Sequence, residues 1–474
     1  ILSKVEQEYD RGRYWPEPLI QINPNYKRQS TVQQLAHEGM LHASCSHIFQ
    51  TGKTEGKAAD LHLYVHQLQA LAKAQKQQSY VVTTGTGSGK SLAFFVPIID
   101  RILKAKAADP QQRTRAIVIY PMNALANSQL EELDKFLHGY PDDQKPFTVA
   151  RYTGQESDAD RKQIADNPPD ILLTNFMMLE LILTRFEDVD RRVVEHCQGL
   201  EFLVLDELHT YRGRQGADVA LLVRRLRERL QAHQLVCIGT SATMSSTGTQ
   251  ADRNQTVASV ASLLFGAQIT EHDVIGETLE RVTNPAKDIE AVKSLLKPAL
   301  LKESYHWPDF ASFSDDPLAV WVELSLGIEL PLNEPPRRAR PVTLGDAAKR
   351  LADDAQCTVE EAHAGLQRFL VAAHDVKTPQ GRAPFAFKLH QFISGPGKVL
   401  ATLEPEGVRH LTLDAQRFAP GRQEEGTQLY PVHFCRDCGQ EYHPVWRSGQ
   451  SQVEYAPREI DDISGDDDEN ARYG

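Results

Sequence analysis

A glycine-rich turn in the first quarter of the chain has the residue types that bind phosphate. It spans residues 84–91 and joins an apolar run, Tyr80–Thr83, to a helical pattern. Glycines let the backbone curl so that its N–H groups point at phosphate oxygens, and the start of the following helix adds a partial positive charge. Lys90 can reach the β- and γ-phosphates of a nucleotide, and the Ser91 hydroxyl can bind magnesium. The turn therefore predicts an ATP site with magnesium as its metal.

The residues expected to line this site are those of the turn: Thr84, Gly85, Thr86, Gly87, Ser88, Gly89, Lys90 and Ser91. The strict phosphate-loop pattern has glycine at the position of Thr84, but the inner glycines and the final Gly-Lys-Ser are intact. A chance glycine-rich loop is the alternative. The strand before the turn, the helix after it and the complete lysine–serine end argue against that alternative.

Two adjacent carboxylates end another apolar run, Phe202–Leu205, and form a second candidate feature. An ATPase needs one carboxylate to hold magnesium and another to orient or deprotonate the attacking water. Asp206 suits the first role and Glu207 the second, because adjacent side chains at the end of a strand can diverge. A charged strand end without function is the alternative, and the phosphate-binding turn makes it the weaker interpretation.

Both features need a sheet whose strand ends meet at one edge. Apolar, β-rich runs occur at Tyr80–Thr83, Ala116–Tyr120, Phe147–Tyr152, Ile171–Thr174, Phe202–Leu205 and Leu235–Gly239. Longer helical patterns lie between them, as at Ser91–Lys104 and Ala124–Leu137. Short apolar strands that alternate with helices predict an α/β fold, with a parallel sheet and helices on both of its faces.

The expected organisation places this sheet in residues 61–245, as the ATP-binding domain. Residues 1–60 are irregular and are expected to form an N-terminal accessory segment, and the polar stretch Ser245–Gln255 reads as a linker. Residues 256–430 mix helices with proline-rich breaks, which predicts a mixed α/β accessory or insertion region. Residues 431–474 hold a cysteine pair and an acidic run.

The composition is that of a globular protein. The chain has 474 residues, of which 41% are hydrophobic and 24% charged, and this excludes a disordered, collagen-like or coiled-coil protein. The formal net charge of -12 excludes a basic coat for nucleic acid but not a local basic groove. Six cysteines are too few for a disulfide framework, and neither a membrane span nor a signal peptide is recognisable. We therefore expect a cytoplasmic location and no membrane partner, and the absence of an initiator Met favours a trimmed or partial chain.

Taken in order, these motifs resemble the first RecA-like lobe of a superfamily 2 helicase of the DEAD/DEAH class. Asp206-Glu207-Leu208-His209 resembles motif II, with leucine where the commoner forms have alanine, and Thr240-Ser241-Ala242-Thr243 resembles motif III. The resemblance implies that Ser241 and Thr243 couple hydrolysis to lobe movement. It also implies that Gln67, upstream of the turn, reads adenine as the Q-motif glutamine does. The implied catalytic residues are Lys90, Asp206 and Glu207.

Three further segments resemble the motifs that contact the nucleic-acid backbone in this family. They are Tyr120–Leu125 (motif Ia), Tyr152–Gly154 (motif Ib) and Leu173–Phe176 (motif Ic). Asparagine and threonine side chains and loop N–H groups at strand ends can bind phosphates without reading the base sequence. The residues expected to do so are Asn123, Thr153, Gly154, Thr174 and Asn175.

The front of the chain carries a finer resemblance. Pro16–Pro24 and Leu41-His42 resemble the opening of large bacterial helicases that often carry a DUF1998-type domain. Among these the Druantia-type phage-defence helicases come first, followed by DISARM-type helicases and, more distantly, Hrq1/MrfA-like repair helicases. The resemblance implies an ATP-dependent helicase or translocase on single-stranded or duplex DNA, with RNA left open, and partner proteins from a defence or repair system.

A helicase motor also needs a second RecA-like lobe, which brings an arginine finger to the transition state. The usual Gln-x-x-Gly-Arg-x-x-Arg pattern does not occur in the chain, and Arg382 and Arg422 follow glycines without the surrounding residues. We therefore expect the second lobe beyond Gly474. The alternative is a non-catalytic scaffold that binds ATP and DNA within a larger assembly.

A cysteine pair near the end of the chain is a candidate zinc site. Cys435 and Cys438 are separated by two residues and followed by a glycine, which suits a turn around one tetrahedral zinc. A structural site needs four ligands, for which His433, His443 or a second cysteine pair beyond Gly474 are the candidates. Two reduced thiols in a hairpin are the alternative.

Two charged clusters remain. Arg337-Arg338-Ala339-Arg340 follows two prolines and is expected to be a loop, with contact to phosphate as the alternative. The acidic run Asp461–Glu469 is expected to be a disordered connector.

Overall fold

The computed structural model describes residues 2–11, 17–85, 87–241, 249–332, 334–391, 398–405, 407–414, 416–435, 438–448, 453–458 and 472–473. The chain divides into two compact units. The sheet unit comprises Pro24–Val282 and Ile328–Arg338, and the accessory unit comprises Ile1–Asn23, Thr283–Gly327 and Ala339–Gly474.

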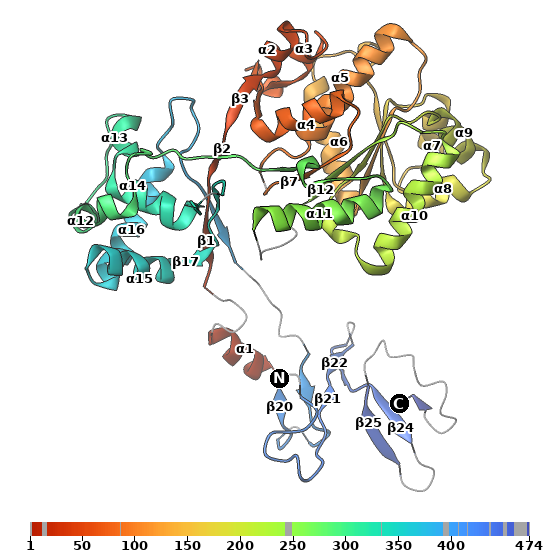
Figure 1. Ribbon diagram of the computed structural model, residues 1–474. Helices are drawn as coiled ribbons and strands as arrows, with labels where there is room; N and C mark the ends of the chain where they lie inside the picture. The colour runs from red at the N-terminus through yellow and green to blue at the C-terminus, as the bar shows by residue number, and fades with distance from the viewer. Residues whose placement is uncertain are drawn as a thin grey trace. The chain divides into compact units, whose positions relative to one another are not determined.

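A seven-stranded parallel sheet forms the centre of the sheet unit, in the order β13-β7-β12-β11-β8-β10-β9 (Figure 1). Its strands are β7 (Tyr80–Thr83), β8 (Ala116–Tyr120), β9 (Val149–Tyr152), β10 (Ile171–Asn175), β11 (Phe202–Leu205), β12 (Val236–Ser241) and β13 (Val274–Gly276). Neighbouring strands are parallel throughout. The predicted RecA-like parallel sheet is confirmed, and each apolar run that predicted a strand forms one.

Alternate residues of each strand face opposite layers of helices. In β7, Tyr80 and Val82 belong to one hydrophobic cluster, whereas Val81 belongs to the other. The first cluster includes residues of α4 (Val65–Gln75), α5 (Leu92–Ala108) and α6 (Asn123–Leu137). The second includes residues of α7 (Asp158–Asp166), α8 (Phe176–Thr184), α9 (Asp188–His196), α10 (Gly213–Arg229) and α11 (Gln250–Phe265). Continuous apolar strands are therefore buried on both faces, as predicted.

The sheet unit extends past residue 245, where the sequence placed its end. Strand β13 pairs with β7, and α11 includes part of the stretch Ser245–Gln255 that was expected to be a linker. Thr249 and Asp252 form a capping box at the start of this helix. The polar stretch that was expected to be a linker thus contains the start of α11. Hydroxyl and carboxylate side chains there satisfy the first N–H groups of the helix.

The expected segment 1–60 is divided between the two units. In the sheet unit, β2 (Asn25–Tyr26) pairs with β14 (Leu279–Glu280), β3 (Arg28–Thr31) with β6 (His62–Tyr64), and β4 (Gln50–Thr51) with β5 (Ala59–Asp60). Two short helices, α2 (Val32–His37) and α3 (Cys45–Ile48), lie between these strands in the chain. Residues 24–60 therefore pack with the sheet and do not form a separate accessory segment.

The basic cluster at Arg337 is partly a strand, contrary to the expected loop. β15 (Ile328–Glu329) and β16 (Arg337–Arg338) form an antiparallel hairpin that belongs to the sheet unit. Arg337 pairs with Glu329 across the hairpin, with 2.6 Å between Nε and Oε2.

The accessory unit is mixed α/β, as expected. β1 (Leu19–Asn23) lies between β17 (Val342–Thr343) and β18 (Ala386–His390) in an antiparallel sheet. Its helices are α1 (Leu2–Asp10), α12 (Ile289–Leu300), α13 (Phe310–Ser314), α14 (Pro317–Val322), α15 (Leu344–Ala355) and α16 (Val359–His374). Short strands follow: β19 (Leu400–Ala401), β20 (Leu411–Thr412), β21 (Tyr430–Pro431), β22 (His433–Phe434), β23 (Glu441–Tyr442), β24 (Val445–Ser448), β25 (Glu454–Pro457) and β26 (Arg472–Tyr473). The acidic run lies outside the described residues. Among the helices that are described, none has the length and apolar character to cross a membrane.

A buried ion network stabilises the start of β8 and β10. Asp170 is fully buried, and its Oδ2 accepts hydrogen bonds from Lys106 Nζ at 2.6 Å and from the Thr148 N–H at 2.9 Å. Its Oδ1 lies 3.7 Å from the guanidinium of Arg115, which is also buried.

We expect Asp170→Ala to lower the free energy of unfolding by about 3 kcal/mol, because the buried Arg115 charge keeps Glu201 but loses its buried partner Asp170. Chemical denaturation followed by circular dichroism measures this change. Asp166→Ala is the matched control, since Asp166 pairs with Arg192 at a partly exposed site, and we expect a change of less than about 1 kcal/mol. Similar small changes in both variants would contradict a stabilising role for the network.

Candidate functional site

The carboxyl ends of β7, β12 and β11 lie side by side, because these strands are neighbours in a parallel sheet. The phosphate-binding turn follows β7, and the acid pair follows β11. Lys90 Nζ lies 3.5 Å from Glu207 Oε1, so the structure brings the two predicted features together. In open parallel sheets, this edge is where ligands bind.

The turn has the curled backbone that a phosphate cradle requires. Gly87 and Gly89 adopt left-handed conformations, with φ of 80° and 66°. Thr84 is buried, and its hydroxyl lies 2.6 Å from the Ser88 hydroxyl, which ties the two ends of the turn together. This bond gives a physical reason for threonine at the position where the strict pattern has glycine. Thr86 lies outside the described residues.

Two side chains of helix α4 form hydrogen bonds with the backbone of the phosphate-binding turn. Gln67 is buried, its Nε2 donates to the Gly89 carbonyl at 2.8 Å, and its Oε1 accepts from the Tyr64 N–H at 2.8 Å. His66 Nε2 donates to the Ser88 carbonyl at 3.0 Å. Burial lowers the pKa of His66, although the bond to Ser88 opposes this change. Gln67 therefore holds the turn, and its reading of adenine stays a prediction.

The acid pair is joined to β12 through one hydroxyl. Thr240 Oγ1 donates to Asp206 Oδ1 and accepts from the Glu207 N–H at 3.2 Å. Glu207 adopts a left-handed conformation with φ of 53°, which is costly for a residue with a side chain. The two carboxylates have different partners, Thr240 for Asp206 and Lys90 for Glu207, and their separate roles stay a prediction. Within motif III, Thr240 makes this link, although the sequence assigned coupling only to Ser241 and Thr243.

His209 links the acid pair to Ser241. Its Nδ1 lies 3.2 Å from Glu207 Oε2 and 3.4 Å from Ser241 Oγ. The predicted coupling residue Ser241 thus reaches the acid pair through one imidazole. Thr243, the other predicted coupling residue, lies outside the described residues.

The surroundings of Asp206 fit a divalent cation. Burial raises the pKa of Asp206, and the Glu207 charge adds to this rise, while bonding to Thr240 and the Lys90 charge oppose it. Among the residues that the structure describes, the buried hydroxyls of Tyr120 and Tyr211 meet no hydrogen-bond partner. Burial and the Asp206 charge raise the pKa of both phenols, so they stay protonated as donors. Magnesium held by Asp206 and Ser91 would balance the negative charge of the half-buried Asp206 carboxylate.

The residues expected to contact nucleic acid gather at the ends of β8, β9 and β10. Asn175 Nδ2 donates to Asn123 Oδ1 at 2.7 Å and to the Thr153 carbonyl at 3.0 Å. Gly154 has φ of 88°, in the left-handed region. Thr174 differs from the expectation, because its fully buried hydroxyl donates to the Tyr152 carbonyl at 2.6 Å and serves the sheet.

Glu156, which the sequence did not single out, occupies the donors of motif Ib. Its carboxylate accepts from the Thr153 N–H at 2.7 Å, the Thr153 hydroxyl at 2.9 Å and the Gly154 N–H at 2.8 Å. Arg151 Nε also donates to it, at 2.7 Å. Burial alone would raise the pKa of Glu156, but these hydrogen bonds lower it overall. An internal carboxylate therefore takes the place that a phosphate was expected to hold.

The cysteine pair lies in the turn between β22 and β23. Cys435 N–H donates to the Gln440 carbonyl at 2.8 Å, and Gly439 N–H donates to the Cys435 carbonyl at 2.9 Å. Among the described residues, which exclude 436 and 437, no three histidine, cysteine or acidic side chains gather as metal ligands. They do not supply the four ligands of a structural zinc site, and zinc stays a prediction.

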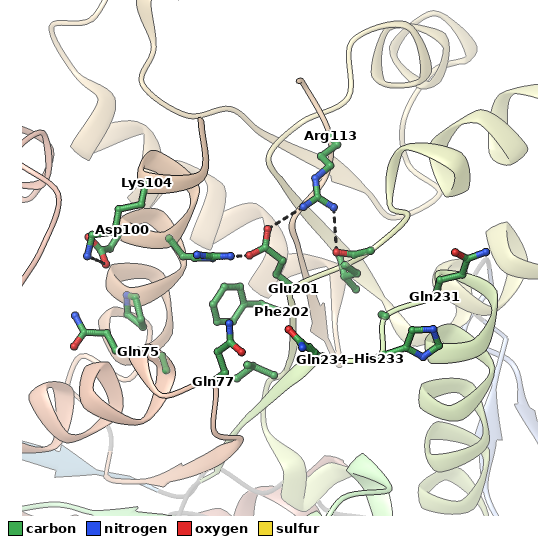
Figure 2. Close-up of a pocket in the computed structure, with 17 residues that line it drawn as sticks. Gln75, Gln77, Asp100, Lys104, Arg113, Glu201, Phe202, Gln231, His233 and Gln234 are labelled. Atoms are coloured by element: carbon green, nitrogen blue, oxygen red, sulfur yellow. Dashed lines mark hydrogen bonds and ion pairs between the residues drawn. The ribbon is translucent and has the colours of Figure 1, made fainter. Parts of the chain in front are cut away.

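A cavity of about 550 Å³ lies at the opposite end of the strands, where β11 and β12 begin (Figure 2). Its charged residues pair with one another. Arg101 and Arg113 contact Glu201 at 2.6 and 3.1 Å, and Lys104 contacts Asp100 at 2.8 Å. The cavity is therefore separate from the predicted ATP site, and its charges are already compensated.

The sequence is similar to those of known helicases. The sequence model of the DEAD/DEAH box helicase family matches residues 64–251. The uncharacterized ATP-dependent helicase YprA of Bacillus subtilis is 34% identical, over 39% of this chain and 23% of its own length. The Druantia protein DruE of Escherichia coli is 26% identical, over 39% of this chain and 16% of its own length. The chain thus spans less than a quarter of either relative.

Among solved structures, the DUF1998 helicase MrfA bound to DNA is 23% identical, with a TM-score of 0.41. The alignment covers 63% of this chain and 38% of that one. The family match contains the phosphate-binding turn, the acid pair and the strands that join them. Residues 64–251 are therefore similar to the DEAD/DEAH box helicase domain.

Proposed function

We propose that this chain supplies the ATP-binding lobe of a helicase or translocase that hydrolyses ATP and moves on nucleic acid, with DNA as the substrate. The observation that carries the proposal is the convergence of Lys90, Glu207, Asp206 and Thr240 at one sheet edge. Structural ion pairs can also join strand ends. The curled turn beside this group makes nucleotide chemistry the better explanation.

Each residue has a distinct task in this proposal. Lys90 binds the β- and γ-phosphates and leaves Glu207, so that Glu207 is released to orient the attacking water. Asp206 and Ser91 would hold magnesium, which neutralises charge that develops on the phosphates. Thr240 contacts both members of the acid pair, so a change at the phosphates alters the end of β12. Movement of β12 is the proposed route from hydrolysis to the second lobe.

The proposal also includes DNA as the nucleic acid and phage defence as the biological setting. The match to DruE is consistent with the resemblance to Druantia-type phage-defence helicases. A repair role is the other setting, and the ATP-dependent helicase HRQ1 of Saccharomyces cerevisiae is 28% identical over 43% of this chain. Partner proteins and a cytoplasmic location stay predictions.

The first test is ATP turnover by the natural full-length protein in the presence of single-stranded DNA, duplex DNA or RNA. We expect Glu207→Gln to reduce turnover at least about 100-fold while ATP still binds, because only water activation is lost. Lys90→Ala should weaken ATP binding itself. Glu195→Gln, at an exposed position on α9, is the matched control and should leave turnover unchanged.

Normal turnover by both Glu207→Gln and Lys90→Ala would contradict the proposed ATP site. If the unchanged protein binds ATP and DNA but does not hydrolyse ATP, the scaffold alternative is correct. Greatest stimulation by RNA would contradict the choice of DNA.

The second test concerns the nucleic-acid face. We expect Asn123→Ala to weaken single-stranded DNA binding about fivefold at every sequence tested, since contacts to phosphate carry no base information. Fluorescence anisotropy at fixed salt measures the affinity. Ser128→Ala, exposed on the same helix, is the control. A loss confined to particular base sequences would contradict a phosphate contact.

A further inference from the structure

An ion pair from two distant segments rests on the phosphate-binding turn. Glu277 follows β13, and Arg338 ends β16, and both belong to the sheet unit. The Gly85 N–H donates to Glu277 Oε2 at 3.0 Å. Arg338 Nε donates to Glu277 Oε1 and Oε2, at 2.9 and 3.1 Å. The Glu277 carboxylate therefore bridges the backbone of the turn and the guanidinium.

Arg338 is held in place by an aromatic side chain. Its Cζ lies 5.2 Å from the centre of the Tyr26 ring, and Nη2 donates to the Tyr26 hydroxyl. The side chains of Arg338 and Glu277 are only 14% and 18% exposed. Burial lowers the pKa of Arg338 to about 10, which leaves the guanidinium charged at neutral pH.

Gly85 provides the space for this arrangement. A Cβ atom at this position would lie 2.6 Å from Arg338 Cζ, which is closer than non-bonded atoms approach. The φ angle of Gly85 is not in the left-handed region. Alanine at this position would therefore displace the Arg338 guanidinium without straining the backbone. Glycine is thus needed at position 85 because the Arg338 guanidinium occupies the space that a side chain would fill.

A negatively charged carboxylate beside a triphosphate site disfavours binding of the negatively charged phosphates. Burial raises the pKa of Glu277, so its charged form is costly without a partner. If Glu277 were left charged and unpaired, it would repel the phosphates that the turn has to bind. Arg338 cancels that charge and leaves the Glu277 carboxylate bonded to the Gly85 N–H.

We propose that Arg338 is a positioning residue for nucleotide binding: it neutralises Glu277 and, through it, holds the phosphate-binding turn ready for ATP. This inference rests on the proposed function. It assigns a role to an arginine that the sequence placed only in a basic loop. The role differs from that of an arginine finger, because Arg338 acts on affinity through Glu277 and not on the reacting phosphate.

The test compares the dissociation constant for magnesium–ATP with kcat at saturating ATP, using the natural full-length protein. We expect Arg338→Met to weaken ATP binding at least about tenfold, because the uncompensated Glu277 charge would repel the phosphates. The kcat at saturating ATP should stay within about threefold, since no reacting group is removed. Gly85→Ala should weaken binding in the same way by displacing the guanidinium.

A double variant separates charge from packing. Arg338→Met combined with Glu277→Gln should restore the affinity to within about threefold of the unchanged protein, because the repelling charge is gone. Arg338→Lys should also retain most of the affinity. Arg337→Met is the matched control and should not alter ATP binding, since the Arg337 side chain pairs with Glu329 at an exposed site.

Three outcomes would overturn the inference. They are unchanged affinity in both Arg338→Met and Gly85→Ala, weak binding that persists in the double variant, and a fall in kcat with normal affinity. Thermal unfolding of each variant shows whether weak binding reflects lost structure, in which case the double variant would also stay weak. If the unchanged protein does not bind ATP, the proposed function fails and the inference fails with it.

Discussion

The register of three neighbouring parallel strands determines the site. Leu205 of β11 lies opposite Gly239 of β12, so the next residues along, Asp206 and Thr240, meet at the sheet edge. Ser241 lies opposite Thr83, which places the start of the phosphate-binding turn at the same level. A slip of one residue in either pairing would turn these side chains to the other face. The chemistry therefore depends on the packing of buried apolar strands that never touch a ligand.

Gly239 shows how closely this packing is adjusted. A Cβ atom there would lie 2.3 Å from Leu208 Cδ1. Leu208 begins the short helical turn that follows the acid pair. The missing side chain in β12 lets this turn pack against the strand, and His209 reaches Ser241. Leucine in the motif, where commoner family members have alanine, thus fills space that a glycine leaves open.

Much of this fold could be predicted from sequence because the relevant signals are local. The apolar runs predicted six of the seven strands, and the turn with its lysine predicted the ATP site. Strand β13 escaped notice because it has only three residues and lies at the edge of the sheet. The partners Tyr26, Glu277 and Arg338 could not be foreseen, since they are far apart in the chain and share no periodic pattern. Their association is a product of tertiary packing.

The two internal carboxylates have different consequences for ligand binding. Glu156 bonds directly to the N–H groups and hydroxyl of the motif Ib loop, so a phosphate at those donors would have to displace it. Arg151 is its partner, but the pair remains a competitor for the same donors. Glu277 bonds to the first glycine of the phosphate-binding turn, and its charge is balanced by Arg338. In the proposed function, the first arrangement would compete with a nucleic-acid phosphate, whereas the second would hold the turn ready for nucleotide.

The same charges bear on whether this chain can hydrolyse ATP by itself. Lys90 pairs with Glu207 and Arg338 pairs with Glu277, so each of these two cations already balances a carboxylate. ATP binding can release Lys90 from Glu207, but Arg338 is confined by Tyr26 and by the space above Gly85. The transition state spreads negative charge over the transferred phosphoryl group and needs a cation that approaches from outside the turn. Among the residues that the structure describes, Lys90 and Arg338 do not meet that need, because we assign Lys90 to ground-state binding and Arg338 to holding Glu277. For the proposed hydrolysis we therefore expect a further cation from another segment or another lobe, whereas we expect ATP binding to proceed without one.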